Sequence, residues 1–356
     1  MIKTGTAEIK SAAQVMTWKC SDYSKRQLFC FFLVLAAFFG AWFAFSARVV
    51  AVPALRASLA FPSEINSALP ILAKQKAFFA TSGVHLAMQP TALSRDALQA
   101  LLDDKADFAL VTDTDFVLSK LAGHDVLILA SLAQARRTLA LVTSGLEDPR
   151  DLQGKEISLR SEPQAHYFLD SFLQIHGLDE IRVKRIENQT LPELGSLLDA
   201  FKAKQIAAAV VRQPVLGQLQ MAMGKQLKVF YGDDVYAMRL LLLVKPSYFA
   251  RNRPAIKAVL TALIDASKAI RDQPSSARRL IGTFLQLDDT LMSRFFDPED
   301  FVVSLDQALL LSLEDQSRWA IKKGLATTAS VMPNYLQMMR LDALETVMPD
   351  AVKIVR

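Results

Sequence analysis

From Leu55 onwards, short apolar segments alternate with segments of helical periodicity, and this alternation limits the possible folds more than any other feature. Val84–Met88 and Asp107–Thr112 are two of the apolar segments, and each is followed by apolar residues at helical spacing. Strands that alternate with amphipathic helices build βαβ units, in which the strands pair in parallel. The sequence therefore predicts an α/β fold.

The alternation forms two successive sets. The first extends from Leu55 to about residue 130, and the second includes the apolar segments Arg137–Thr143 and Lys155–Leu159. Arg239–Val244 is a further apolar segment, after which helical periodicity continues to the end of the chain. This order is consistent with two groups of strands, each covered by its own helices.

A different pattern sets the N-terminal part apart. Leu28–Phe45 is an uncharged run of 18 residues. A helix of that length spans about 27 Å, close to the thickness of the hydrocarbon core of a bilayer. Lys25 and Arg26 precede the run and Arg48 alone follows it, which predicts an N-terminus in the cytoplasm.

We therefore expect a cytoplasmic leader (residues 1–26), one transmembrane anchor (residues 27–47) and a body that faces the periplasm from a bacterial inner membrane. A cleaved signal peptide is the alternative, because Ala44-Phe45-Ser46 offers small residues to a peptidase. The apolar run is longer than the ~7–15 residues usual in such peptides, which favours the anchor.

Composition argues against several classes of function. The formal net charge is +5, but no basic stripe with interleaved aromatic residues crosses the body, so we expect no nucleic-acid binding. Both cysteines, Cys20 and Cys30, precede the body, which therefore has no disulfide and no thiol nucleophile. The histidines lack the spacing of zinc ligands, and no phosphate-binding glycine loop is present. We expect neither a metal nor a cofactor.

Candidate site residues follow from one rule, that ligands of parallel α/β sheets bind outside the carboxyl ends of the strands. The polar side chains selected in this way are Ser63, Glu64, Thr112, Asp113, Arg160, Ser161 and Arg212.

Arg160 and Arg212 follow strands of the same set, and their guanidinium groups beside a helix N-terminus would hold an anion. Structural ion pairs or solvent exposure are the alternatives for both arginines. If they bind the solute, alanine at either position should weaken binding roughly ten- to hundredfold and leave stability nearly unchanged.

Two of these positions have further interpretations. Ser161 begins a Ser-Glu-Pro-Gln segment that matches a capping box, so we expect Ser161 to cap the next helix. Asp113, Asp115 and Glu64 could instead receive an ammonium group, while Thr114 or Asp115 could cap a helix. A carboxylate pair for acid–base catalysis is disfavoured, because nothing nearby offers a nucleophile or an electrophile.

The order of several short motifs resembles the type 2 periplasmic binding proteins of ABC importers, in the branch that binds aliphatic sulfonates, taurine, nitrate and thiamine pyrimidine precursors. Asp151–Lys155 resembles the turn into the second lobe of that branch, and Leu101–Phe108 resembles its helix followed by a small-Asp-Phe strand. The resemblance extends over about residues 55–285. It is interrupted at Phe61–Glu64 and Arg212–Pro214, where the residues usual at ligand-facing positions are replaced.

The resemblance implies two α/β lobes that close on a solute and are joined by two crossover strands, near residues 137–144 and 237–244. Lobe one would comprise residues 53–138 plus 240–356, and lobe two residues 142–236.

The resemblance also implies a function. We expect a membrane-anchored solute-binding protein that captures a small anionic solute for an ABC permease and is not an enzyme. One alternative is a ligand-sensing module for a signalling partner. A remote alternative is an enzyme like the thiamine pyrimidine synthases of yeast, which need a cysteine-rich iron motif that the body lacks.

Overall fold

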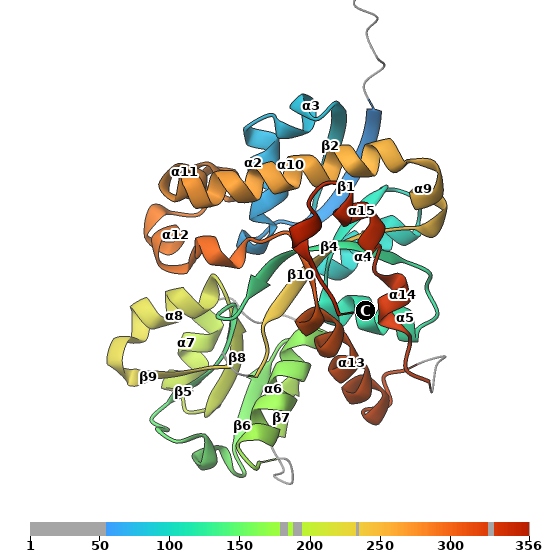
Figure 1. Ribbon diagram of the computed structural model, residues 1–356. Coiled ribbons are helices and arrows are strands. Elements are labelled where there is room, and N and C mark those ends of the chain that lie inside the picture. Colours follow the sequence, from blue (N-terminus) through green and yellow to red (C-terminus); the bar gives the residue numbers. More distant parts are fainter. Residues whose placement is uncertain (1–54, 179–183, 188–193, 233–234, 327–330, 356) are drawn as a thin grey trace, which may run out of the picture. The chain divides into compact units, whose positions relative to one another are not determined.

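The computed structural model describes residues 55–355, except for residues 179–183, 188–193, 233–234 and 327–330 (Figure 1). The predicted leader and the predicted transmembrane segment Leu28–Phe45 lie outside the described residues. Within the described ranges, no helix is long and apolar enough to cross a membrane.

The first sheet, in the described part of the chain, has five strands in the order β2-β1-β3-β10-β4. Its strands are β1 (Leu55–Pro62), β2 (Val84–Thr91), β3 (Phe108–Thr112), β4 (Leu127–Ala135) and β10 (Met238–Val244). β1, β2 and β3 pair in parallel, whereas β10 is antiparallel to both β3 and β4. β3 and β10 are buried along their whole length, which explains why their sequences are continuous apolar runs.

The second sheet repeats this arrangement with the order β7-β6-β8-β5-β9, again counted over the described residues. Its strands are β5 (Leu139–Ser144), β6 (Glu156–Leu159), β7 (Lys184–Glu187), β8 (Ala208–Arg212) and β9 (Leu227–Tyr231). β6, β7 and β8 are parallel, and β5 is antiparallel to β8 and β9. The predicted α/β fold is confirmed.

Helices connect the strands of both sheets (Figure 1). Those associated with the first sheet are α2 (Ala68–Gln75), α3 (Phe78–Thr81), α4 (Ser94–Leu102), α5 (Asp113–Leu121), α9 (Pro246–Arg251), α10 (Arg253–Asp272), α11 (Pro274–Leu285), α12 (Asp289–Phe295), α13 (Gln307–Lys322), α14 (Tyr335–Met338) and α15 (Leu341–Glu345). Those associated with the second sheet are α6 (Pro163–Ile175), α7 (Leu194–Lys202) and α8 (Val215–Met223).

Short elements complete the fold. The 3-10 helices are η1 (Ile65–Ser67), η2 (Pro149–Leu152), η3 (Gly224–Gln226), η4 (Pro298–Asp300) and η5 (Pro349–Ala351), and the short strands β11 (Leu305–Asp306) and β12 (Val352–Lys353) pair in parallel.

The chain passes between the sheets twice, from β4 to β5 and from β9 back to β10. We call the part built on the first sheet lobe one and the part built on the second sheet lobe two. The predicted division, residues 53–138 plus 240–356 and residues 142–236, remains a proposal. The order of the strands supports it, with β5 in the second sheet and β10 in the first.

The predicted capping box at Ser161 is wrong. α6 begins at Pro163, its N-cap residue is Glu162, and no side chain caps it. Glu162 is extended (φ −79°, ψ 129°) because the residue before a proline is disfavoured in the helical region. A helix starting directly after Ser161 would need Glu162 to be helical. Pro163 therefore moves the start of the helix past Glu162 and leaves that side chain available for other contacts.

Candidate functional site

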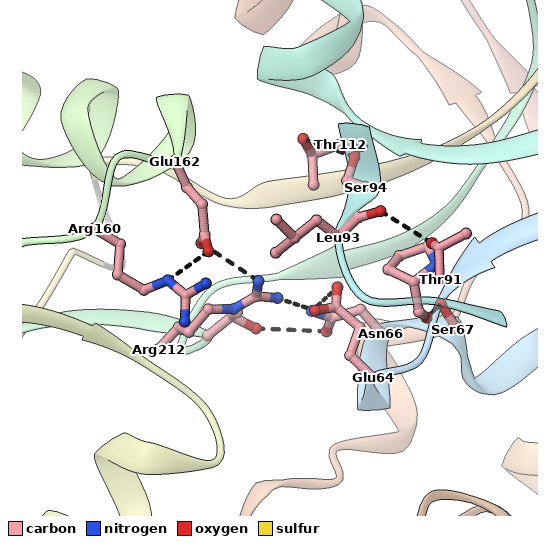
Figure 2. A network of polar contacts seen from close by, with 12 residues as sticks. Glu64, Asn66, Ser67, Thr91, Leu93, Ser94, Thr112, Arg160, Glu162 and Arg212 are labelled. Carbon is pink, nitrogen blue, oxygen red and sulfur yellow. Dashed lines mark hydrogen bonds and ion pairs between the residues drawn. The ribbon is translucent and has the colours of Figure 1, made fainter. Parts of the chain in front are cut away.

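Charged side chains from both lobes meet where the strands of the two sheets end (Figure 2). Glu64 follows β1 in lobe one, Arg212 ends β8, and Arg160 and Glu162 lie between β6 and α6. We call Glu64, Arg160, Glu162 and Arg212 the ion-pair network.

Arg212 is the centre of this network. Its Nη2 contacts Glu64 Oε2 across the two lobes, and its Nη1 lies 3.6 Å from Glu162 Oε2. Arg160 Nε lies 2.6 Å from Glu162 Oε1. Asn66 Nδ2 donates to Glu64 Oε1 over 3.4 Å, which helps to orient Glu64 toward lobe two.

The network is largely removed from solvent. The side chains of Arg212, Glu64 and Glu162 are 16%, 18% and 6% exposed. Burial lowers the pKa of Arg212 to about 10, which leaves its guanidinium charged at neutral pH. Burial also raises the pKa of Glu162, while Arg160 opposes this rise. Two cations and two carboxylates balance one another, and loss of Arg212 leaves the poorly solvated Glu64 without its cation.

A cavity of about 800 Å³ adjoins the Glu64–Arg212 pair. Its walls come from the loop after β1, from the region of α12 and η4, from the β4–β5 connection, and from the segment after β8. Its charged lining residues in the described part of the chain are Glu64, Arg136, Arg137, Arg212, Arg294, Asp297 and Asp300. The cavity thus touches both lobes and carries more arginine than acidic side chains.

The charge of the cavity depends on pH through Asp300. Burial and the neighbouring Asp297 raise the pKa of Asp300 to about 7, and Arg136 partly opposes this effect. The cavity therefore becomes more positive as the pH falls through neutrality.

The predicted site residues are only partly brought together. Ser63, Glu64 and Arg212 line the cavity, whereas Arg160 is not among the lining residues and is linked to Arg212 through Glu162. Ser161 is half-buried beside Glu162. The assignment of these residues to a ligand remains a prediction.

Thr112 caps the helix that we expected Thr114 or Asp115 to cap. It is the N-cap of α5: its hydroxyl accepts from the Asp115 backbone N–H over 3.4 Å and donates to the Asp115 carboxylate over 2.9 Å. Its own backbone N–H donates to Ser94 Oγ over 2.7 Å (Figure 2). The expectation that Thr114 or Asp115 caps this helix is therefore wrong by two or three positions.

Asp113 lies in a buried polar cluster and not on the cavity lining. Its carboxylate accepts from the Tyr236 hydroxyl over 2.6 Å and from Gln316 Nε2 over 2.8 Å. Thr114 Oγ1 lies 3.1 Å from the same Tyr236 hydroxyl. Burial raises the pKa of Asp113 to about 6, although Tyr236 and Gln316 favour the ionised form. The cluster joins α5 and α13 to the segment that returns from lobe two.

A second contact between the lobes involves α13. Trp319 Nε1 donates to Asp170 Oδ2 over 2.9 Å, and Lys323 Nζ lies 3.0 Å from the same oxygen. The Trp319 ring meets Tyr167 edge-on at 5.3 Å between centroids. Because Asp170 and Tyr167 belong to α6, the C-terminal part of lobe one reaches across to lobe two.

Sequence reasoning missed several residues at this site. Glu162 was interpreted only as part of a capping box, although its position between Arg160 and Pro163 could have indicated an acceptor for arginine. Arg136 and Arg137 follow β4, which runs in the same direction as β3, but the sequence pattern placed Arg137 inside the next apolar segment. Arg294 lies within α12, where the strand-end rule selects nothing. No group of three or more potential metal ligands occurs among the described residues.

Two sheets of matching strand order, crossed twice by the chain, with a cavity between them, define the class: the fold is that of the type 2 periplasmic binding proteins. The predicted resemblance to that class is confirmed by comparison with known proteins. A family model described as NMT1/THI5 like matches residues 64–277, which is more than half of the chain. The protein belongs to this family. No curated protein matches the chain.

Solved structures show the same fold at low sequence identity. The periplasmic aliphatic sulphonate binding protein SsuA from Escherichia coli matches with a TM-score of 0.70 and 14% identity, over 82% of this chain and 99% of that chain. The alkanesulfonate-binding protein SsuA from Xanthomonas axonopodis pv. citri, bound to MOPS, matches with a TM-score of 0.65 and 16% identity, over 81% and 99%.

An enzyme also shares the fold. The desulfurization enzyme DSZB matches with a TM-score of 0.60 and 14% identity, over 83% of this chain and 99% of that chain. Because binding proteins and an enzyme share this architecture, function has to be argued from the site.

Proposed function

We propose that this protein is a solute-binding protein that captures a small anion of the sulfonate, nitrate or carboxylate class for an ABC permease. The observation that carries the proposal is the position of Arg212, which ends β8, contacts Glu64 of lobe one and lines the cavity, while Arg160 follows the neighbouring parallel strand β6. Guanidinium groups bind such anions through paired hydrogen bonds.

Glu64 competes with the solute in this proposal. It holds Arg212 from the opposite lobe, so its carboxylate occupies the place that a bound anion would take. Separation of the lobes would withdraw Glu64, whereas Glu162 belongs to the same lobe as both arginines and would stay. An incoming anion would then replace Glu64 at Arg212 and allow the lobes to close around it.

This competition predicts that Glu64→Gln strengthens anion binding by on the order of tenfold, because the amide has no charge to offer Arg212. A thermal-shift screen of the full-length protein against sulfonates, nitrate, carboxylates and pyrimidines would select the anion, and calorimetry would compare the variants. Glu147→Gln is the matched control, since Glu147 pairs with Lys228 on the surface. Weaker anion binding by Glu64→Gln, or a best ligand that is cationic, would overturn the proposal.

Binding without catalysis is part of the same proposal. Both cysteines precede the body, which removes the thiol chemistry and the cysteine-rich motif expected of an enzyme in the thiamine pyrimidine synthase group. The site offers arginines, of which Arg212 would be freed for an anion once Glu64 withdraws.

We also propose that Leu28–Phe45 anchors the protein in the inner membrane with the body in the periplasm, where it would meet a permease. The flanking Lys25 and Arg26 support this orientation. Alkaline phosphatase fused after Pro53 should be active, because that enzyme matures only outside the cytoplasm. A silent fusion, with the same enzyme active behind a known export signal, would refute the orientation.

A further inference from the structure

The cavity is larger than a small anion requires. Its volume is about 800 Å³, whereas pockets of roughly 300–1,000 Å³ bury ligands of drug size. Nitrate or a short alkanesulfonate would leave most of this space to water. A solute that fills the cavity needs a sizeable body in addition to its anionic group.

Lobe one provides an apolar wall for such a body. The wall consists of Leu285 at the end of α11, Leu287 just after it, and Phe295, Phe296 and Phe301 around α12 and η4. The rings of Phe296 and Phe301 stack at 5.0 Å between centroids, with 26° between their planes. Both rings are nearly inaccessible to solvent, whereas Phe295 is half-buried.

Lobe two presents an aromatic ring to the same space. Tyr231, the last residue of β9, lines the cavity, and Gln220 Nε2 donates to its hydroxyl over 3.1 Å. This hydrogen bond restrains the ring. The cavity is therefore lined by aromatic side chains from both lobes.

Arginines accompany the aromatic rings. The Arg137 guanidinium lies 5.3 Å from the centroid of the Tyr231 ring, and the Arg294 guanidinium lies 5.7 Å from that of Phe295. Guanidinium groups stack on flat π systems as well as pair with anions. A planar ring that carries negative charge could both stack on these guanidinium groups and pair with their charge.

Gly217 in α8 shows how closely the lobes meet at Phe295. A Cβ atom at this position would fall well inside the van der Waals contact distance of the Phe295 ring. The missing side chain therefore allows Phe295 to rest against α8, which holds the ring at the edge of the cavity.

We propose that the cavity takes an organic anion with a planar aromatic body, whose charged group meets Arg212 and whose ring lies between Tyr231 and Phe295. The inference rests on the proposed function, because it specifies the kind of solute held at the same site. Burying an aromatic ring in such a cavity should strengthen binding on the order of a hundredfold over an anion without one.

The test uses calorimetry on the full-length protein with ligand pairs that share an anionic group. Naphthalene-2-sulfonate is compared with methanesulfonate, and 2-naphthoate with acetate; 2-naphthylmethanol serves as the uncharged aromatic probe. We expect the aromatic anion of each pair to bind much more tightly than its small partner, and the uncharged probe to bind weakly.

Two variants test which side chains cause the preference for aromatic anions. Tyr231→Leu and Phe295→Leu keep an apolar side chain but remove the ring, and each should reduce the preference for the aromatic anion by roughly three- to tenfold. The quantity compared is the ratio of the two affinities, with the small anion as the internal reference for each variant. Phe230→Leu is the matched control, because Phe230 neighbours Tyr231 in β9 but packs against Phe172, with 6.1 Å between ring centroids.

Each other outcome has a definite meaning. Equal affinity for aromatic and small anions overturns this inference and leaves the proposed function standing. A preference that is the same in all variants, or equal binding of 2-naphthylmethanol, also overturns it, because the rings or the arginines would then not be responsible. If no anion binds at all, the proposed function fails as well.

Discussion

Arg212→Ala should lower the free energy of unfolding by about 3–5 kcal/mol, because it leaves buried carboxylates without their shared cation. Glu64 and Glu162 both contact Arg212, and the two carboxylates are 18% and 6% exposed. Glu162 keeps Arg160, but Glu64 would keep only the neutral amide of Asn66. Urea unfolding of the full-length protein, followed by circular dichroism, measures the loss.

This expectation differs from the one based on sequence alone, in which alanine at Arg212 weakens binding and leaves stability nearly unchanged. Because Arg212 belongs to the ion-pair network, the same substitution should lower both stability and anion affinity. Anion affinity should still fall roughly ten- to hundredfold, provided that binding is measured well below the unfolding temperature of the variant.

Three further variants separate the causes. Arg212→Lys should restore part of the stability, because an ammonium group can meet one carboxylate but not both in the paired geometry of a guanidinium. Arg212→Ala should lower the free energy of unfolding less in the Glu64→Gln background than in the parent, because the carboxylate of Glu64 is then absent. Arg150→Ala removes an exposed arginine of lobe two that pairs with Asp148, and it should leave stability unchanged. If Arg212→Ala unfolds at the same urea concentration as the parent, the ion-pair network does not stabilise the fold.

Asp113→Ala should also lower the free energy of unfolding, by about 3 kcal/mol or more, because it leaves two buried donors without an acceptor. The Tyr236 hydroxyl and the Gln316 amide both donate to Asp113, which is fully inaccessible to solvent. Tyr236→Phe removes one donor and keeps the aromatic packing, so its cost should be smaller, about 1–3 kcal/mol.

The effect of Asp113→Ala should depend on pH. Folding raises the pKa of Asp113 from 3.8 to about 6, so the folded state holds a proton that the unfolded state releases between these values. The contribution of Asp113 to stability is therefore greatest below pH 4 and declines as the pH rises to about 6. The difference between parent and variant should be larger at pH 5 than at pH 8. A pH-independent difference would contradict the raised pKa.

The candidate site was harder to predict than the fold, for a reason that Arg212 illustrates. Its position after a strand correctly indicated the edge of the second sheet, but its partner Glu64 lies 148 residues away in the other lobe. Asp113 was placed at a strand end by the same rule, yet Tyr236 and Gln316, 123 and 203 residues away, cover it. The strand-end rule locates a residue along the chain and says nothing of what packs over it.

Arg136, Arg137 and Arg294 show a different limit. Arg136 and Arg137 follow β4, whose end the sequence pattern placed too early, and Arg294 lies within a helix. All three reach the cavity because the β4–β5 connection and α12 meet there. No local pattern brings these segments together, and only the packing of the lobes does.

Local sequence patterns predicted most strands and helices in the right order, because helical and strand periodicities are set by which side chains can be buried, but they did not predict β7 and β9. The sequence also determined where α6 begins, since Pro163 restricts Glu162, although the capping box obscured this. Which charges neutralise one another, and which polar groups are covered, follows from the packing of the folded chain. Those outcomes depend on side chains such as Glu64 and Arg212, which are far apart along the chain and meet only after both lobes have folded.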